Sequence, residues 1–158
     1  SNTWSLCSKM TLTMQAQAQQ TITDSVLKHT QALCEALTQN YIDYSIRGHQ
    51  KFVGTDADTH EYHQRKIDEL KAGKCDYSHI IESGSKYHKI IQVIDNGPNR
   101  MGPSRSVHAF VDKKTGEVYK SASWKSPAKG VRFDLRVINQ REWLLENADW
   151  AGGYLYRR

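Results

Sequence analysis

Apolar side chains recur with a period of three to four residues between positions 22 and 37. The stripe consists of Ile22, Val26, Leu27, Leu33, Cys34 and Leu37. This spacing predicts a helix over about residues 15–40. The next apolar residues either extend this helix or begin a loop; they are Tyr41, Tyr44 and Ile46. Gly48 is expected to end this helix or loop segment.

A second, shorter helix is predicted after the turn-rich segment 54–58. Asp58 or Thr59 can cap its first turn, and Gly73 lies where a C-terminal glycine belongs. Its apolar-leaning side carries Ile67 and Leu70 together with a histidine, and the other positions are polar. We therefore expect this helix to lie on the surface of the domain.

The hydrophobic period changes to two after Gly73, which predicts strands. The segments are 77–82, 86–95, 106–112, 117–121 and 131–135. The third and fourth flank the turn 113–116, where Gly116 is expected to take the left-handed conformation of a hairpin. Alternation along the third strand predicts that Val107, Ala109 and Val111 share one face, with His108 and Phe110 on the other.

The ends of the chain complete the predicted fold. Residues 140–149 are expected to form a short helix, followed by an aromatic and basic tail. Residues 1–14 are expected to be a disordered leader or an upstream remnant outside the fold. The predicted architecture is a single α+β domain over residues 15–158. It has two N-terminal helices, an antiparallel sheet of three to five strands and a short C-terminal helix.

Composition places the chain among packed globular domains. Its 158 residues are 38% hydrophobic and 25% charged. No apolar run reaches the roughly 18 residues of a membrane-spanning helix, and no signal-peptide pattern is present, so we expect a cytoplasmic protein without a membrane partner. Three widely spaced cysteines without a CxxC pair fit a reducing compartment.

Charge is distributed unevenly along the chain. Residues 1–99 contain ten Lys and Arg against eleven Asp and Glu, whereas residues 100–158 contain twelve against six. The first part therefore has a net charge of −1 and the second of +6, which together give the +5 of the whole chain. A basic half attracts polyanions such as nucleic acid, although ordinary surfaces also reach this charge.

The segment 106–136, SVHAFVDKKTGEVYKSASWKSPAKGVRFDLR, resembles a motif of small proteins of tailed bacteriophages of the marine and cyanophage type. The flanking IESGSKYHKII (81–91) and ADWAGGYLYRR (148–158) are similar to the flanks of that motif. The function of this family is unknown. The resemblance implies a phage accessory protein in the cytoplasm of an infected bacterial host, and it transfers no catalytic residue.

A basic and aromatic surface is the first candidate site. Its cations are Lys113, Lys114, Lys120, Lys125, Lys129, Arg132 and Arg136, and Phe110, Tyr119 and Trp124 are near them in sequence. Aromatic rings on a sheet can stack on bases while Lys and Arg hold phosphates, which favours nucleic-acid binding. In the alternative, Phe110 and Tyr119 form a cross-strand pair in the core and the lysines are ordinary solvated charges.

The second candidate is a metal site formed by His60, His63, Cys75 and His79, because imidazole and thiolate are the ligands that zinc prefers. Seven histidines in the chain make chance pairs common, so scattered histidines are the alternative. Neither a GxSxG nor a phosphate-cradling P-loop pattern occurs, and no cofactor is expected. The sequence thus favours a binding protein, for nucleic acid or for a host, phage or virion protein, over a metal-dependent enzyme.

Overall fold

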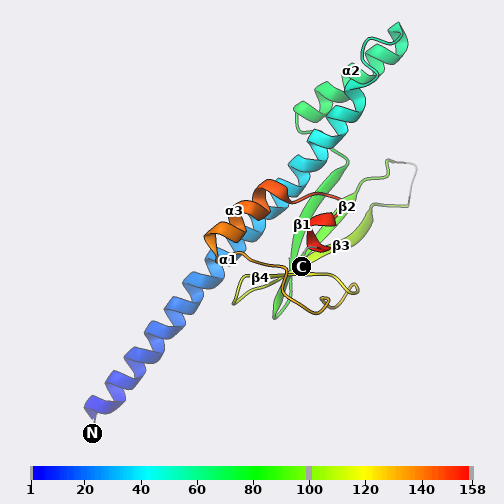
Figure 1. The fold of residues 1–158 in the computed structure, drawn as a ribbon. Coiled ribbons are helices and arrows are strands. Elements are labelled where there is room, and N and C mark those ends of the chain that lie inside the picture. The colour runs from blue at the N-terminus through cyan, green and yellow to red at the C-terminus, as the bar shows by residue number, and fades with distance from the viewer. Residues whose placement is uncertain (1, 99–100, 157–158) are drawn as a thin grey trace.

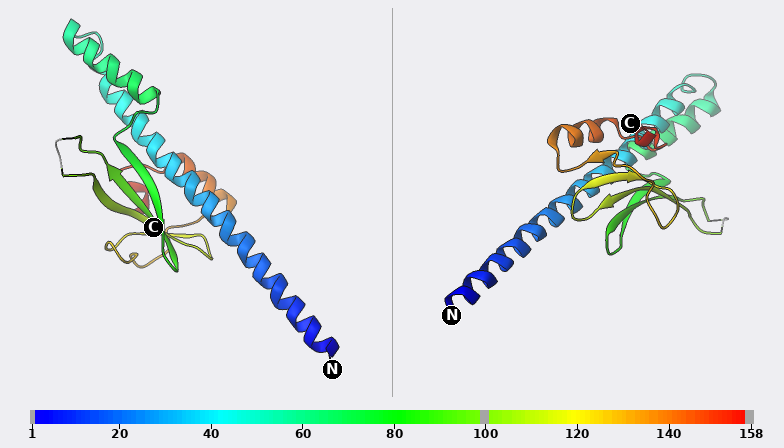
Figure 2. Two further views of the ribbon diagram at one scale, coloured as in Figure 1. Left: turned by 180° about the vertical axis from the view of Figure 1, so that it is seen from behind. Right: turned by 60° about the horizontal axis from the view of Figure 1, so that its bottom comes forward.

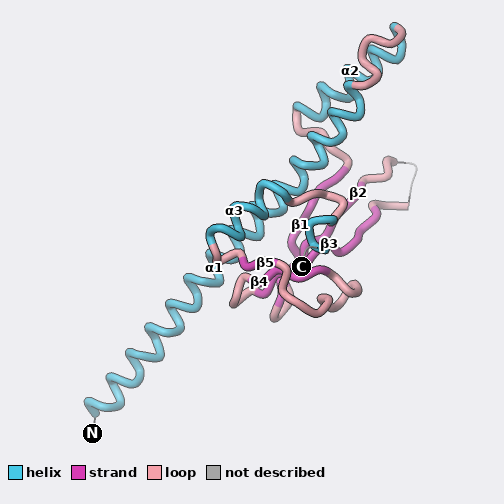
Figure 3. Tube along the Cα trace, in the orientation of Figure 1, coloured by secondary structure: helices cyan, strands magenta, loops and turns pink. Residues whose placement is uncertain are grey.

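A computed structural model describes residues 2–98 and 101–156 of the chain (Figure 1). Two helices come first, then five strands, a third helix and a short 3-10 helix (Figure 3). The elements are α1 (Asn2–Gln50), α2 (Ala57–Lys71), β1 (Tyr77–Ser83), β2 (Tyr87–Ile94), β3 (Ser104–Asp112), β4 (Glu117–Lys120), β5 (Phe133–Asp134), α3 (Ile138–Asn147) and η1 (Gly153–Tyr156). The α+β class and the antiparallel sheet are confirmed.

Helix α1 is much longer than its apolar stripe, with 49 residues and a length of about 70 Å. The predicted boundary near residue 15 is wrong, because the residues assigned to a disordered leader are helical from Asn2 onward. Figure 1 shows this N-terminal part projecting beyond the sheet. Gln, Ala and Met favour helix there without burial, and a search for buried stripes cannot detect such a segment. At the other end, Tyr41 stacks on Tyr77 at 3.8 Å between ring centroids.

Helix α2 folds back along the end of α1 (Figure 1) and buries Ile67 and Leu70. Its N-cap is Asp56, and the predicted caps at Asp58 and Thr59 are wrong. The Asp56 carboxylate accepts hydrogen bonds from the backbone N–H and the hydroxyl of Thr59 at 3.0 and 2.9 Å. Asp58 lies instead in the first turn, where a carboxylate interacts favourably with the helix dipole.

The five strands form an antiparallel meander in the order β1-β2-β3-β4-β5. One face of the sheet packs against α1, where Leu33 and Leu37 meet Ile90, Ala109 and Val111 in a fully buried core. The helices lie on this side of the sheet (Figure 2, right). The opposite face is therefore left without a helical layer.

A β-bulge in β3 changes which side chains share a face. The register shifts between Ile90 and Ile91, so that Ile90 pairs with Ala109 and Ile91 pairs with Val107. His108 is the extra residue, and its ring lies on the α1 side, 5.6 Å from the ring of His79. The prediction that His108 shares a face with Phe110 is wrong, since strict alternation fails at a bulge.

The C-terminal segment returns over the α1 side of the sheet. Helix α3 begins two residues before the predicted start and ends at Asn147, and η1 buries Tyr154 and Leu155. The Arg132 Nε donates to the carbonyl of Leu155 at 2.7 Å and anchors this segment. In the described residues no helix has the length and apolar character needed to cross a membrane.

Gly116 occupies the left-handed position predicted for the β3–β4 hairpin, with φ of +78°. An added Cβ would lie 3.1 Å from the Cγ of Arg136 and 3.3 Å from a methyl group of Val26. Gly116→Ala is expected to lower the free energy of unfolding by about 2 kcal/mol, from backbone strain and crowding together. Urea unfolding followed by circular dichroism measures this change.

Gly73→Ala is the matched control for this prediction. Gly73 has φ of +86°, but nothing lies within 4 Å of its added Cβ. This variant should therefore lose only about 1 kcal/mol, the backbone contribution. Equal losses in the two variants would contradict the crowding of Gly116 against α1.

Candidate nucleic-acid interface

The sheet face opposite α1 combines aromatic rings with cations. In β2, His88 and Ile90 are buried on the α1 side. Their neighbours Tyr87 and Lys89 therefore point to the opposite face, because side chains alternate along a strand. In β3, Phe110 lies between two core residues and pairs across the strands with Lys89 and Tyr119. We call this surface the aromatic–basic face; it comprises Lys86, Tyr87, Lys89, Arg105, Phe110, Tyr119, Trp124 and Lys125.

Ring contacts hold the aromatic part of this face in place. Tyr87 makes edge contacts with Phe110 at 5.7 Å and with Tyr119 at 6.1 Å between centroids. Phe110 is only 2% exposed and forms the floor, whereas Trp124 is 42% exposed. The alternative that Phe110 and Tyr119 form a cross-strand pair is confirmed, and Trp124 is the ring that remains open to a ligand.

Cations surround these rings at close range. The Lys89 ammonium lies 4.7 Å from the centroid of Trp124, and the Arg105 guanidinium lies 5.8 Å from the same ring. Lys86 lies 5.3 Å from the ring of Tyr87. Each distance falls within the range of a cation–π interaction, so the positive groups are held beside the aromatic surfaces.

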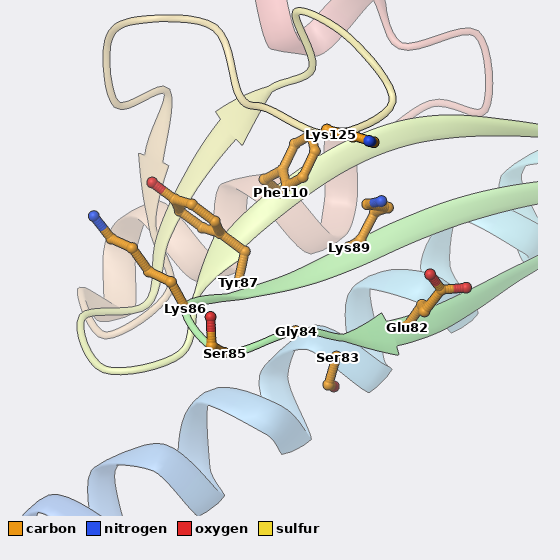
Figure 4. Close-up of a pocket in the computed structure, with 9 residues that line it drawn as sticks. All are labelled: Glu82, Ser83, Gly84, Ser85, Lys86, Tyr87, Lys89, Phe110 and Lys125. Atoms are coloured by element: carbon orange, nitrogen blue, oxygen red, sulfur yellow. The ribbon is translucent and has the colours of Figure 1, made fainter.

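A hollow of about 360 Å³ lies between the β1–β2 turn and the strands (Figure 4). The turn residues 83–85 and Lys86 form one side, and Lys89, Phe110 and Lys125 form the other. Glu82 lies at its edge and pairs with Arg105 at 3.2 Å. In the described part of the chain, Lys86, Lys89 and Lys125 form no ion pair with a carboxylate, so their charge is available to an anion.

The tyrosine at the margin of the face remains a neutral hydrogen-bonding group. Burial raises the pKa of Tyr119, and the nearby carboxylate of Glu117 raises it further. The Tyr119 hydroxyl lies 3.5 Å from a carboxylate oxygen of Glu117, to which it donates. At neutral pH this side chain therefore adds no negative charge to a surface that would meet phosphates.

The cations predicted from the sequence lie in different parts of the structure. Trp124 and Lys125 belong to the aromatic–basic face, and Lys113 lies at its border, where its ammonium donates to the carbonyl of Gly84 at 3.0 Å. Lys120 instead lies 4.0 Å from the ring of Tyr156 in η1. Lys114 and Lys129 are exposed in connections outside the hollow, and Arg136 is exposed beside Gly116.

Arg132, the last of the predicted cations, is a structural residue. Its guanidinium donates to the carbonyls of Leu155, Lys129 and Gly130. The prediction missed Lys86, Lys89 and Arg105 because they are about 20 to 40 residues from Lys125 in sequence. Lys89 could have been predicted from the sequence, because alternation along its strand places it on the face opposite to its apolar neighbour Ile90.

The four residues predicted to bind a metal do not come together. His60 accepts a hydrogen bond from the Gly54 backbone N–H at 2.9 Å, and His63 contacts His49. His79 lies within the sheet, hydrogen-bonded to Thr38, while burial raises the pKa of Cys75 in the loop before β1. Among the described residues no group of three His, Cys, Asp or Glu side chains could hold a metal.

Comparison with known proteins gives a family without an assigned activity. Residues 10–157 match a family model described as a family of unknown function. No curated protein and no solved structure matches the chain. The matched range covers α1 from Met10, the whole sheet and the C-terminal helices, so the aromatic–basic face lies entirely within it.

Proposed function

Because the chain belongs to DUF7717, a family of unknown function, its activity has to be inferred from geometry, and we propose that the aromatic–basic face binds single-stranded nucleic acid. The observation that carries this proposal is the helix-free sheet face on which Lys89 and Arg105 flank the exposed ring of Trp124. Bases stack on such rings, and the cations neutralise the adjacent phosphates.

The origin of the protein is part of the same proposal. The resemblance of residues 106–136 to a motif of tailed-bacteriophage proteins supports an accessory phage protein that acts in the cytoplasm of an infected bacterium. That segment contains Phe110, Tyr119, Trp124 and Lys125. Single strands of phage or host nucleic acid would be the ligand.

Removing the cations tests the electrostatic part of the interface. The triple variant Lys86→Gln, Lys89→Gln, Lys125→Gln should weaken binding of a labelled oligonucleotide at least tenfold. It should also reduce the slope of log affinity against log salt by about 2, since each lost phosphate contact contributes about 0.7. Fluorescence anisotropy over a range of KCl concentrations measures both quantities, with single-stranded DNA and RNA as probes.

The control variant removes the same charge elsewhere. Lys28, Lys71 and Lys74 are exposed on α1 and at the end of α2. Changing these three to Gln should leave both the affinity and its salt dependence close to wild type. If the two triple variants weaken binding equally, attraction is due to net charge and the proposed face is wrong.

The exposed indole gives a second, independent test. Trp124→Ala should weaken binding by about 1–3 kcal/mol, the usual contribution of one stacked base, and leave the salt slope unchanged. Trp124 is 42% exposed and is not a member of the core cluster between the sheet and α1, so the fold should survive this change. Binding that is unaffected by Trp124→Ala would contradict stacking at this face.

A second candidate function is binding to a host, phage or virion protein, and the projecting part of α1 favours it. Met10, Leu12 and Met14 are 63%, 63% and 66% exposed there. Residues 10–23 contain no charged side chain. A complex formed by this segment would persist at high salt and without nucleic acid, which sedimentation velocity distinguishes from binding at the aromatic–basic face.

A further inference from the structure

Two histidines connect the end of α1 to the middle of α2, away from the aromatic–basic face. His49 lies in the last turn of α1 and His63 lies in α2. Their Nδ1 atoms are 2.7 Å apart, and the ring centroids are 5.0 Å apart. At this distance one ring donates its Nδ1–H to the lone pair of the other. When both rings carry their hydrogen on Nε2, the two Nδ1 lone pairs face the same gap.

Aromatic side chains fix the orientation of this pair. Phe52 stacks on the ring of His63 with centroids 4.8 Å apart. Tyr62 presents its ring edge-on to His63 at 5.0 Å and to His49 at 6.4 Å. Because α2 also buries Ile67 and Leu70 against α1, the two imidazoles are held by packing rather than only by their mutual hydrogen bond.

Open volume lies beside the pair. A hollow of about 420 Å³ is lined by His49, Tyr62 and Lys66, among others, and a second of about 560 Å³ is lined by both histidines. Ser45 borders both hollows. An ion held by the pair would therefore have space for several coordinated water molecules.

We infer that His49 and His63 form a two-ligand site for a divalent transition metal, with Zn²⁺, Ni²⁺ and Cu²⁺ as the class of ion. Imidazole nitrogen is a good ligand for all three. Bonds of about 2.0–2.1 Å at a tetrahedral angle place the two nitrogens about 3.3 Å apart. The pair needs to open by only about 0.6 Å from its present separation to reach that geometry.

The expected affinity is moderate, because the chain supplies only two ligands. Among the described residues no third His, Cys, Asp or Glu completes the site, so water occupies the other positions. Metal bound to both helices would connect α1 to α2 and stabilise the packing of these two helices against each other. This inference is independent of nucleic-acid binding, since none of its residues belongs to the aromatic–basic face.

Titration of ZnCl₂ into the untagged full chain at neutral pH tests the site. Isothermal calorimetry should find one Zn²⁺ per chain with a dissociation constant in the micromolar range, and thermal unfolding should shift to higher temperature. His49→Gln and His63→Gln should each weaken binding at least tenfold. His60→Gln, on the same helix and hydrogen-bonded to Gly54, is the control and should bind like the wild type.

A spectroscopic measurement identifies the ligands directly. Cu²⁺ bound to the wild-type chain should give an electron paramagnetic resonance spectrum with nitrogen hyperfine splitting, which His63→Gln should abolish or reduce. Absence of binding at millimolar Zn²⁺ would overturn the inference. Unchanged binding in both histidine variants would overturn it as well, because the metal would then be held elsewhere.

Discussion

Lowering the pH from 7 to 4 is expected to destabilise this protein strongly, through two histidines buried between the sheet and the helices. Burial, with a smaller contribution from His108, lowers the pKa of His79 to about 4. Burial also lowers the pKa of His108 to about 4, against a small opposing effect of the Asp149 carboxylate. Both rings are therefore neutral in the folded protein at neutral pH.

The direction of the pH effect follows from these shifts. Each pKa is lower in the folded chain than the value of 6.5 for an unperturbed histidine, so between pH 6.5 and 4 the unfolded chain binds more protons. The stabilisation is complete above pH 6.5 and is lost as the pH falls toward 4. A pKa difference of this size corresponds to about 3 kcal/mol of folding free energy for each ring. The two contributions are not strictly additive, because the neighbouring rings titrate together.

The surroundings explain why protonation is unfavourable at this place. The His79 Nδ1 is 2.9 Å from the hydroxyl of Thr38, and the His108 Nε2 is 2.7 Å from the hydroxyl of Tyr154. The two rings are 5.6 Å apart, so a second positive charge would repel the first. The carboxylate of Asp149 acts in the opposite direction and raises the pKa of His108 slightly.

Urea unfolding at several pH values between 7 and 4 checks this prediction. The double variant His79→Gln, His108→Gln should be less stable than wild type at pH 7, where it has lost the native packing. Its loss of stability on acidification should be smaller by several kcal/mol. His60→Gln serves as a control for removal of a histidine outside the pair. An equal pH dependence in wild type and double variant would show that carboxylates, rather than these rings, cause acid unfolding.

Local sequence patterns predicted the parts of the fold that local physics determines. Alternation located all five strands to within a few residues, and the glycine of the β3–β4 turn took its predicted conformation because a residue without Cβ adopts a positive φ without steric cost. Strand β5 is the weakest case, with only Phe133 and Asp134 paired in place of the predicted five residues. Its length depends on its pairing with β4, which its own sequence does not specify.

Features that depend on distant parts of the chain were not predictable. The bulge that turns His108 toward His79 is a shift in the register between β2 and β3. Neither strand has a glycine or proline at this point, so no local sequence signal indicates the bulge. The aromatic–basic face takes Lys86 and Lys89 from the near-neutral half of the chain and Arg105 and Lys125 from the basic half. The uneven charge along the sequence therefore indicated a basic region but not its members.

The long first helix illustrates a third limit. The stripe that predicted it consists of residues buried in the core against the sheet, such as Val26 and Leu33. The helix itself continues to Asn2, because backbone hydrogen bonds and favourable residues need no partner surface. Hydrophobic periodicity thus predicts where a helix is covered, rather than where it begins.

Leu33→Ala is expected to remove about 2–5 kcal/mol from the free energy of unfolding, a large part of the total of a domain of this size. The Leu33 side chain is 0% exposed in the centre of α1 and belongs to the core that joins this helix to the sheet. Truncation leaves a cavity whose walls come from several elements. Neighbouring side chains can fill only part of it without leaving their preferred rotamers.

The same substitution at Leu12 separates this packing effect from helix propensity. Leu12 lies on the same helix, N-terminal to the buried stripe, and is 63% exposed. Leu12→Ala should change the stability by less than about 0.5 kcal/mol, because alanine favours helix and no cavity forms. Urea unfolding of both variants at pH 7 measures the difference. A similar cost at the two positions would mean that residues near Leu12 are also buried in solution, and that the sheet covers only part of the helix surface the folded protein uses.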